Sequence, residues 1–198
     1  MDDRKIIQIC LAILACFPSL VFAHSEGASE GFLSGLLHPV FGYDHFLAML
    51  SVGIVSAQLG GRDIWMIPSV FVLAMIFGGV MGGYSVEIPL VEMGIAISVI
   101  ILGIAIILAD GGVHGSGSIL IKAFVAFFGV FHGHAHGVEM PRSADPVFYV
   151  FGFVISTCSI HLLGVLIGYV FVEQRQWAHI LKVAGAGVAG AGLFILIN

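Results

Sequence analysis

The chain is unusually rich in histidine, with nine His against seven Lys and Arg in 198 residues. Imidazole is a good ligand for zinc, copper, iron and nickel, and carboxylates add harder oxygen donors. Two short segments, 38–45 and 132–139, combine both types of side chain. The candidate ligands in these segments are His38, Asp44, His45, His132, His136 and Glu139. These residue types indicate binding of a divalent transition-metal ion.

The spacing in segment 132–139 suits a helix. His132 and His136 are four residues apart, so a continuous helix would place both rings on one face. His134 would then point almost the opposite way. We therefore expect His132 and His136 to act together and His134 to contribute less.

The spacing in segment 38–45 argues against a shared ion on a straight helix. His38 and His45 are two helical turns apart, about 10 Å, whereas metal–nitrogen bonds are only about 2 Å long. Gly42 lies between them. A helix break at this glycine would bring the two rings closer together.

A wider set of candidate ligands contains Glu92, His161, His134 and His24. Each has a structural alternative. Glu92 would cap or pair near the membrane interface, and His161 would bond to Ser156, Thr157 or a backbone carbonyl. His24 would offer both an α-amine and an imidazole if it became the first residue of a processed chain.

The composition shows what kind of molecule must position these residues. The chain is 59% apolar and 10% charged, against about 25% charged residues in a typical soluble domain. With seven Lys and Arg against twelve Asp and Glu, it has no basic patch for nucleic acid. The three scattered Cys indicate neither a disulfide framework nor a thiolate metal site. We expect an all-α integral membrane protein.

Short polar breaks divide the chain into six apolar runs, at 31–59, 64–83, 88–109, 118–131, 147–171 and 177–197. Most runs have close to the ~20 residues that a helix needs to cross the hydrocarbon core. No barrel-type alternation of polar and apolar residues is present. The fourth run is short unless its His-rich end continues as a helix. The sequence predicts a bundle of six transmembrane helices.

The first 23 residues are typical of a secretory signal peptide. Arg4 and Lys5 precede the apolar stretch, and Val21-Phe22-Ala23 fits a small-residue cleavage site. The alternative is an uncleaved anchor helix. The domains we expect are a signal peptide, 1–23, and a six-helix transmembrane domain, 24–198.

The basic residues predict the orientation. Of the five Lys and Arg after the signal, only Arg142 would lie outside, which fits the positive-inside rule. Both ends of the mature chain would then lie outside the inner membrane of a bacterium. His, Asp and Glu from four helices would gather in the outer half, with only His114 and His179 on the inner side. Ionisable groups at such depth are costly and mark functional sites.

Two motifs resemble those of a known family. The segment His38-Pro39-Val40-Phe41-Gly42-Tyr43-Asp44-His45-Phe46-Leu47-Ala48-Met49 is similar to HPxxGxDHxLAM of the HupE/UreJ family. The segment 131–141, FHGHAHGVEMP, is similar to its FHGxAHGxExP motif. The resemblance implies a nickel/cobalt permease linked to hydrogenase or urease systems. It also implies metal-binding roles for the six ligands named first, and leaves His134 at a variable position.

The leading function is therefore uptake of Ni²⁺ or Co²⁺, with the ion as transported substrate and no prosthetic group. Two alternatives stay open: a membrane-embedded metal-dependent hydrolase and an accessory membrane subunit for metalloenzyme assembly. We expect no enzyme, because no H-E-x-x-H, G-x-S-x-G or phosphate-loop motif occurs. The expected partners are the bilayer and the ion, with a second copy of the chain or a metallochaperone as further alternatives.

Overall fold

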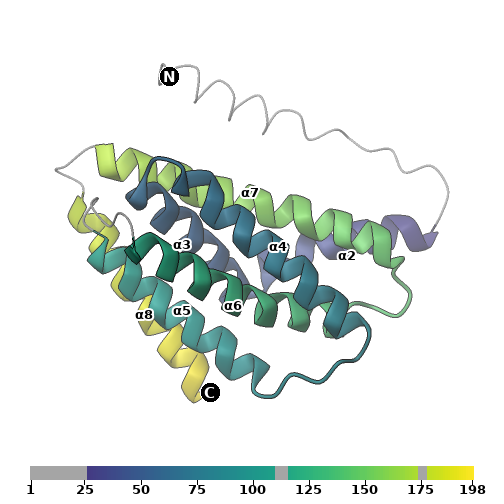
Figure 1. Cartoon of the computed structure of the whole chain (residues 1–198). Coiled ribbons are helices and arrows are strands. Elements are labelled where there is room, and N and C mark those ends of the chain that lie inside the picture. Colours follow the sequence, from purple (N-terminus) through teal and green to yellow (C-terminus); the bar gives the residue numbers. More distant parts are fainter. Residues whose placement is uncertain (1–25, 110–115, 174–177) are drawn as a thin grey trace, which may run out of the picture.

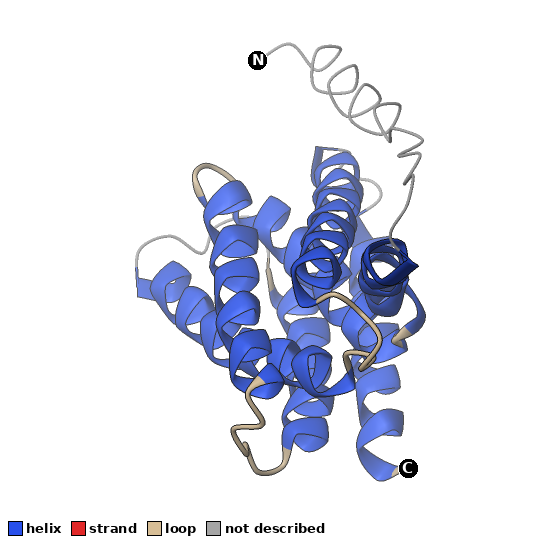
Figure 2. Ribbon diagram, turned by 90° about the vertical axis from the view of Figure 1, so that its right-hand side faces the viewer, coloured by secondary structure: helices blue, strands red, loops and turns tan. Residues whose placement is uncertain are grey.

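The computed structural model describes residues 26–109, 116–173 and 178–198. The predicted signal peptide and the candidates His24 and His114 lie outside these residues. The described part consists of helices and connecting loops, with no strand (Figure 2). Its helices are α2 (Glu26–Phe41), α3 (Tyr43–Leu59), α4 (Asp63–Gly83), α5 (Val91–Leu108), α6 (Ser116–Glu139), α7 (Pro146–Glu173) and α8 (Ala178–Ile197).

Among the described helices, five are long and apolar enough to cross a membrane: α4, α5, α6, α7 and α8. Helices α2 and α3 pass the same test only as a pair, and they bend by 77° at the break between them. The predicted all-α membrane fold is thus confirmed. The count of six spans stays a prediction, since it requires the bent pair to form one span.

Helix α3 is the centre of the bundle. Helices α5 and α8 lie side by side at one edge, and α7 runs along another edge with α2 and α3 packed against it (Figure 1). Most residues of α3 are buried, including Ala48, Met49 and Val52. Outward-facing apolar residues such as Leu73 and Phe77 on α4 are exposed instead, as expected for side chains that meet lipid.

Glycines bring α4 and α6 into backbone contact. A Cβ on Gly133 would overlap the Met75 carbonyl oxygen, and one on Gly137 would overlap the Gly79 carbonyl oxygen. This agrees with the small-residue spacing of both helices, which lets backbones approach closely. Helices α4 and α7, by contrast, touch little. Two grooves of about 470 and 390 Å³ lie along their seam.

The predicted and observed helix limits differ at two places. The first apolar run is not one helix, because the backbone at Gly42 is extended and separates α2 from α3. The third run begins at Val91 rather than residue 88, since Leu90 adopts a left-handed conformation with φ of 59°. The fourth run continues as a helix through its His-rich end to Glu139.

Candidate metal centre

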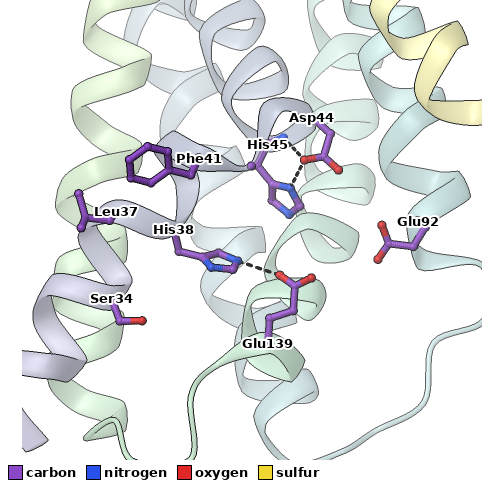
Figure 3. A pocket seen from close by; sticks show the side chains of 9 residues that line it. Ser34, Leu37, His38, Phe41, Asp44, His45, Glu92 and Glu139 are labelled. Atoms are coloured by element: carbon purple, nitrogen blue, oxygen red, sulfur yellow. Dashed lines mark hydrogen bonds and ion pairs between the residues drawn. The ribbon is translucent and has the colours of Figure 1, made fainter. Parts of the chain in front are cut away.

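A vestibule of about 470 Å³ opens where the end of α2, the starts of α3 and α5, and the end of α6 meet (Figure 3). Its polar lining comes from all four helices and consists of Ser34, His38, Asp44, His45, Glu92 and Glu139. The cavity therefore joins His38, Asp44 and His45 of the first motif to Glu139 of the second, although about a hundred residues separate them in the chain.

The break at Gly42 brings the first motif together around His136. The His38 ring, at the end of α2, lies 4.9 Å from the His136 ring between centroids. The His45 ring, at the start of α3, lies 4.2 Å from the same ring. The two-turn separation expected on a straight helix does not apply, because the bend turns both side chains toward α6.

Three side chains offer donor atoms close enough for one ion. Ligand atoms of His38, His136 and Glu139 all lie within 4.8 Å of one another. The His38 Nε2 and Glu139 Oε2 atoms are 2.8 Å apart. Bonds of about 2.1 Å set donor atoms roughly 3–4 Å apart around an ion. Small side-chain rotations would bring all three donors to that spacing.

Asp44 orients the imidazole of His45. Its Oδ1 atom accepts a hydrogen bond from His45 Nδ1 at 2.7 Å and another from the His45 backbone N–H at 2.8 Å (Figure 3). The Nε2 atom of His45 is buried without a hydrogen bond in the described structure. Ligating histidines commonly donate their second ring N–H to a carboxylate in this way. Asp44 thus leaves the Nε2 lone pair available.

Ser98 plays the corresponding part for His132. The Ser98 hydroxyl donates to the Ile95 carbonyl at 2.7 Å, and its oxygen lies 2.8 Å from His132 Nε2. Since the hydroxyl has one hydrogen, His132 Nε2–H is the donor of the second bond. The fully buried His132 therefore keeps a lone pair on Nδ1, which has no hydrogen bond in the described structure. Its ring lies 4.9 Å from that of His45.

Helix α7 supports the central ring of the cluster. The Phe153 ring lies 4.6 Å from that of His136, and the Tyr149 hydroxyl donates to the His136 carbonyl at 3.3 Å. Both nitrogens of His136 are buried without a hydrogen bond in the described structure. Either nitrogen of His136 is therefore available as a ligand atom for an ion.

The other sequence candidates lie at different places. Glu92, in the first turn of α5, lines the vestibule. His134 points away from the cluster, as expected, and its Nε2 donates to the Val86 carbonyl at 2.6 Å. His161 is buried deeper along α7, and its ring lies 5.3 Å from that of Phe71. His179 is exposed near the start of α8.

Comparison with known proteins decides the family. A family model described as HupE / UreJ protein matches residues 11–195. The chain belongs to the HupE/UreJ family. It is 38% identical over 193 residues to Protein HupE of Rhizobium leguminosarum bv. viciae, with 97% of each chain covered. No solved structure matches it.

Membership of the HupE/UreJ family confirms the resemblance seen in the two motifs. The apolar helices and the family together describe a bacterial multi-pass membrane protein. The HupE/UreJ family implies nickel- or cobalt-related transport or an accessory function. Sequence reasoning missed Ser98 and Tyr149, because single hydroxyl residues in apolar runs carry no signal until their helices are placed together.

Proposed function

We propose that this HupE/UreJ protein carries Ni²⁺ or Co²⁺ into the cell, and that the ion first binds in the vestibule. The observation that supports this most is the convergence of His38, His136 and Glu139 within 4.8 Å. Imidazole nitrogens with one carboxylate suit these borderline ions. Asp44–His45 and His132 lie next to the group, so the ion would find further ligands as it moves inward.

The basic residues support an outward-facing vestibule. Arg62, Lys122 and Lys182 lie at the end of the bundle away from the vestibule, while Arg142 follows α6 at the vestibule end. Lys122 Nζ pairs with Asp63 Oδ1 at 2.8 Å at that far end. By the positive-inside rule, the vestibule faces outward across the inner membrane and α2–α3 act as the sixth span. Cleavage of residues 1–23 as a signal peptide belongs to the same proposal.

The arrangement suits transport better than tight storage. His38 and Glu139 are partly exposed, with side-chain accessibilities of 32% and 47%, so an ion reaches them while still partly hydrated. Deeper ligands are buried, so hydration is lost in steps. Binding at each step must stay weak enough for release. A divalent ion gains about 4.6 kcal/mol per 100 mV on entering a negative interior, which favours inward movement.

Two alternative functions predict different measurements. An accessory subunit for metalloenzyme assembly would be needed for enzyme activity without moving metal across the membrane. A metal-dependent hydrolase would hold its ion with an open coordination position for water and would cleave a substrate. If uptake requires a metallochaperone or a second copy of the chain, the single protein without that partner should show no uptake.

Uptake of radiolabelled Ni²⁺ and Co²⁺ by cells expressing the chain tests the proposal. We expect uptake to be lost with His136→Ala and with Glu139→Gln, because each change removes a ligand from the converging group. His179→Ala, which alters an exposed histidine far from the vestibule, is the matched control and should retain uptake. Unchanged uptake by both vestibule variants, at equal amounts of protein in the membrane, would contradict the proposal.

A further inference from the structure

The Phe71 ring packs against His132, at the inner edge of the candidate metal centre. Phe71 on α4 is only 1% exposed. Its ring centroid lies 5.5 Å from that of His132 on α6 and 5.3 Å from that of His161 on α7. Phe71 thus contacts the deepest histidine of the vestibule cluster on one side and a separate buried histidine on the other.

His161 is buried with at most one hydrogen-bond partner. The ring is 2% exposed, and the Thr157 backbone, one turn earlier on α7, lies within reach of one ring nitrogen. The other nitrogen has no hydrogen bond within the described residues. The hydroxyls of Ser51 on α3 and Thr157 on α7 are likewise buried without partners there. Unpaired buried polar atoms are costly, so several of them in the interior call for a ligand.

The helix that carries Phe71 is able to deform next to it. Pro68 lies inside α4, one turn before Phe71. Proline lacks a backbone N–H, and its ring crowds the carbonyl of the preceding turn, so helices bend most readily at such positions. A bend at Pro68 would move the first turns of α4 and so let the Phe71 ring change its orientation, while the glycine contacts that begin at the Phe71 backbone stay in place.

We propose that Phe71 is the barrier between the vestibule ligands and His161, and that His161 is the next ligand on the path. This inference rests on the proposed transport function. A phenyl ring offers no donor atom to a partly dehydrated cation, and an apolar constriction of this kind blocks passage until it moves. Beyond the ring, His161 supplies a nitrogen, and the buried Thr157 hydroxyl lies one turn earlier on the same helix.

Influx into proteoliposomes that contain a Ni²⁺-sensitive dye tests the barrier. At saturating external Ni²⁺, Phe71→Leu should raise the initial rate several-fold, because it removes the ring, and Phe71→Trp should lower it. Phe77 is an exposed phenylalanine on the same helix, so Phe77→Leu and Phe77→Trp are matched controls and should leave the rate unchanged. Ni²⁺ affinity in calorimetry should match the wild type in all four variants, because the vestibule ligands are intact.

His161→Ala tests the second half of the proposal. It should lower the saturated rate several-fold while calorimetric binding at the vestibule stays as in the wild type. Rates of the Phe71 variants equal to those of the Phe77 variants would overturn the barrier, and a normal rate for His161→Ala would overturn the inner ligand. Absence of influx through the wild-type protein would instead reject the transport function on which both depend.

Discussion

At the scale of single residues, the site is defined by which ring nitrogen each histidine leaves free. The Asp44 carboxylate holds His45 Nδ1, so Nε2 is available, whereas the Ser98 hydroxyl holds His132 Nε2, so Nδ1 is available. Neutral imidazole has one donor and one acceptor nitrogen, and the second partner decides which is which. These tautomers leave the lone pairs on His45 Nε2 and His132 Nδ1 available for an ion.

Removing the charge of Asp44 should weaken metal binding without altering the shape of the site. For Asp44→Asn we expect Ni²⁺ affinity to fall roughly 10–100-fold, as is usual when the carboxylate behind a ligating histidine is lost. Calorimetry on the detergent-solubilised protein measures this. Asp145→Asn is the matched control, because Asp145 only caps the first turn of α7 and Asn caps helices equally well. Equal affinities of the two variants would show that Asp44 does not support a ligand.

Transport should also fall with acidity. An ion binds neutral imidazole, so protons compete for the ligand nitrogens as the external pH falls. We therefore expect uptake to decrease as the external pH is lowered from neutral. Uptake measured at a clamped membrane potential tests this, and His179→Ala should show the same profile. A flat profile would mean that histidine ligation does not limit the rate.

At the scale of helices, the glycines of α6 determine where its histidines lie. In Gly133→Ala the new methyl would overlap backbone atoms of Met75, which cannot move aside as the end of a flexible side chain could. We expect a loss of about 1–3 kcal/mol in stability from such overpacking, together with weaker Ni²⁺ binding. Thermal unfolding followed by size-exclusion chromatography measures the first effect.

The same substitution on α8 provides the control for Gly133→Ala. No atom lies within 4 Å of a Cβ built on Gly187, so Gly187→Ala should leave both stability and metal binding unchanged. If Gly133→Ala is as stable as Gly187→Ala, α4 and α6 are not held by backbone contact as described.

How well the ends of each helix could be predicted from the sequence depends on what determines where that helix begins and ends. Apolar length predicts α4, α7 and α8 nearly to their observed ends, since bilayer thickness sets their size. The start of α5 was less predictable, because a left-handed Leu90 gives no compositional signal. The bend at Gly42 was anticipated only as an alternative. Its 77° angle arises from packing of α2 and α3 on α7, which no local pattern encodes.

The candidate site was predictable in part for a different reason. His, Asp and Glu are rare in apolar helices, so their positions stand out, and the predicted residues do lie in the vestibule or in ring contact with its histidines. Phe71 is one of 16 phenylalanines, and nothing in its sequence context distinguishes it from those that face lipid. Its place between His132 and His161 emerges only when α4, α6 and α7 are packed together.

At the scale of the whole molecule, the vestibule and the C-terminus should lie on the same side of the membrane. Helix α8 packs antiparallel to α5, with Gly185 against Gly103 and Gly192 against Ile100. Asn198 therefore ends near the level at which α5 begins. In a background without native cysteines, we expect Asn198→Cys to react with an impermeant maleimide in spheroplasts and Arg62→Cys to be protected. The opposite labelling pattern would invert the proposed orientation.

The backbone contact between α4 and α6 makes these two helices a single rigid body. Carbonyl oxygens packed against glycines prevent the two helices from sliding along each other, so any rearrangement larger than the local bend at Pro68 must occur between this body and its neighbours. The seam with α7, where contact is sparse and two grooves run, is the natural plane of motion. For the proposed transport, acyl chains that fill those grooves would resist or ease each cycle, so its rate should depend on the thickness and fluidity of the bilayer.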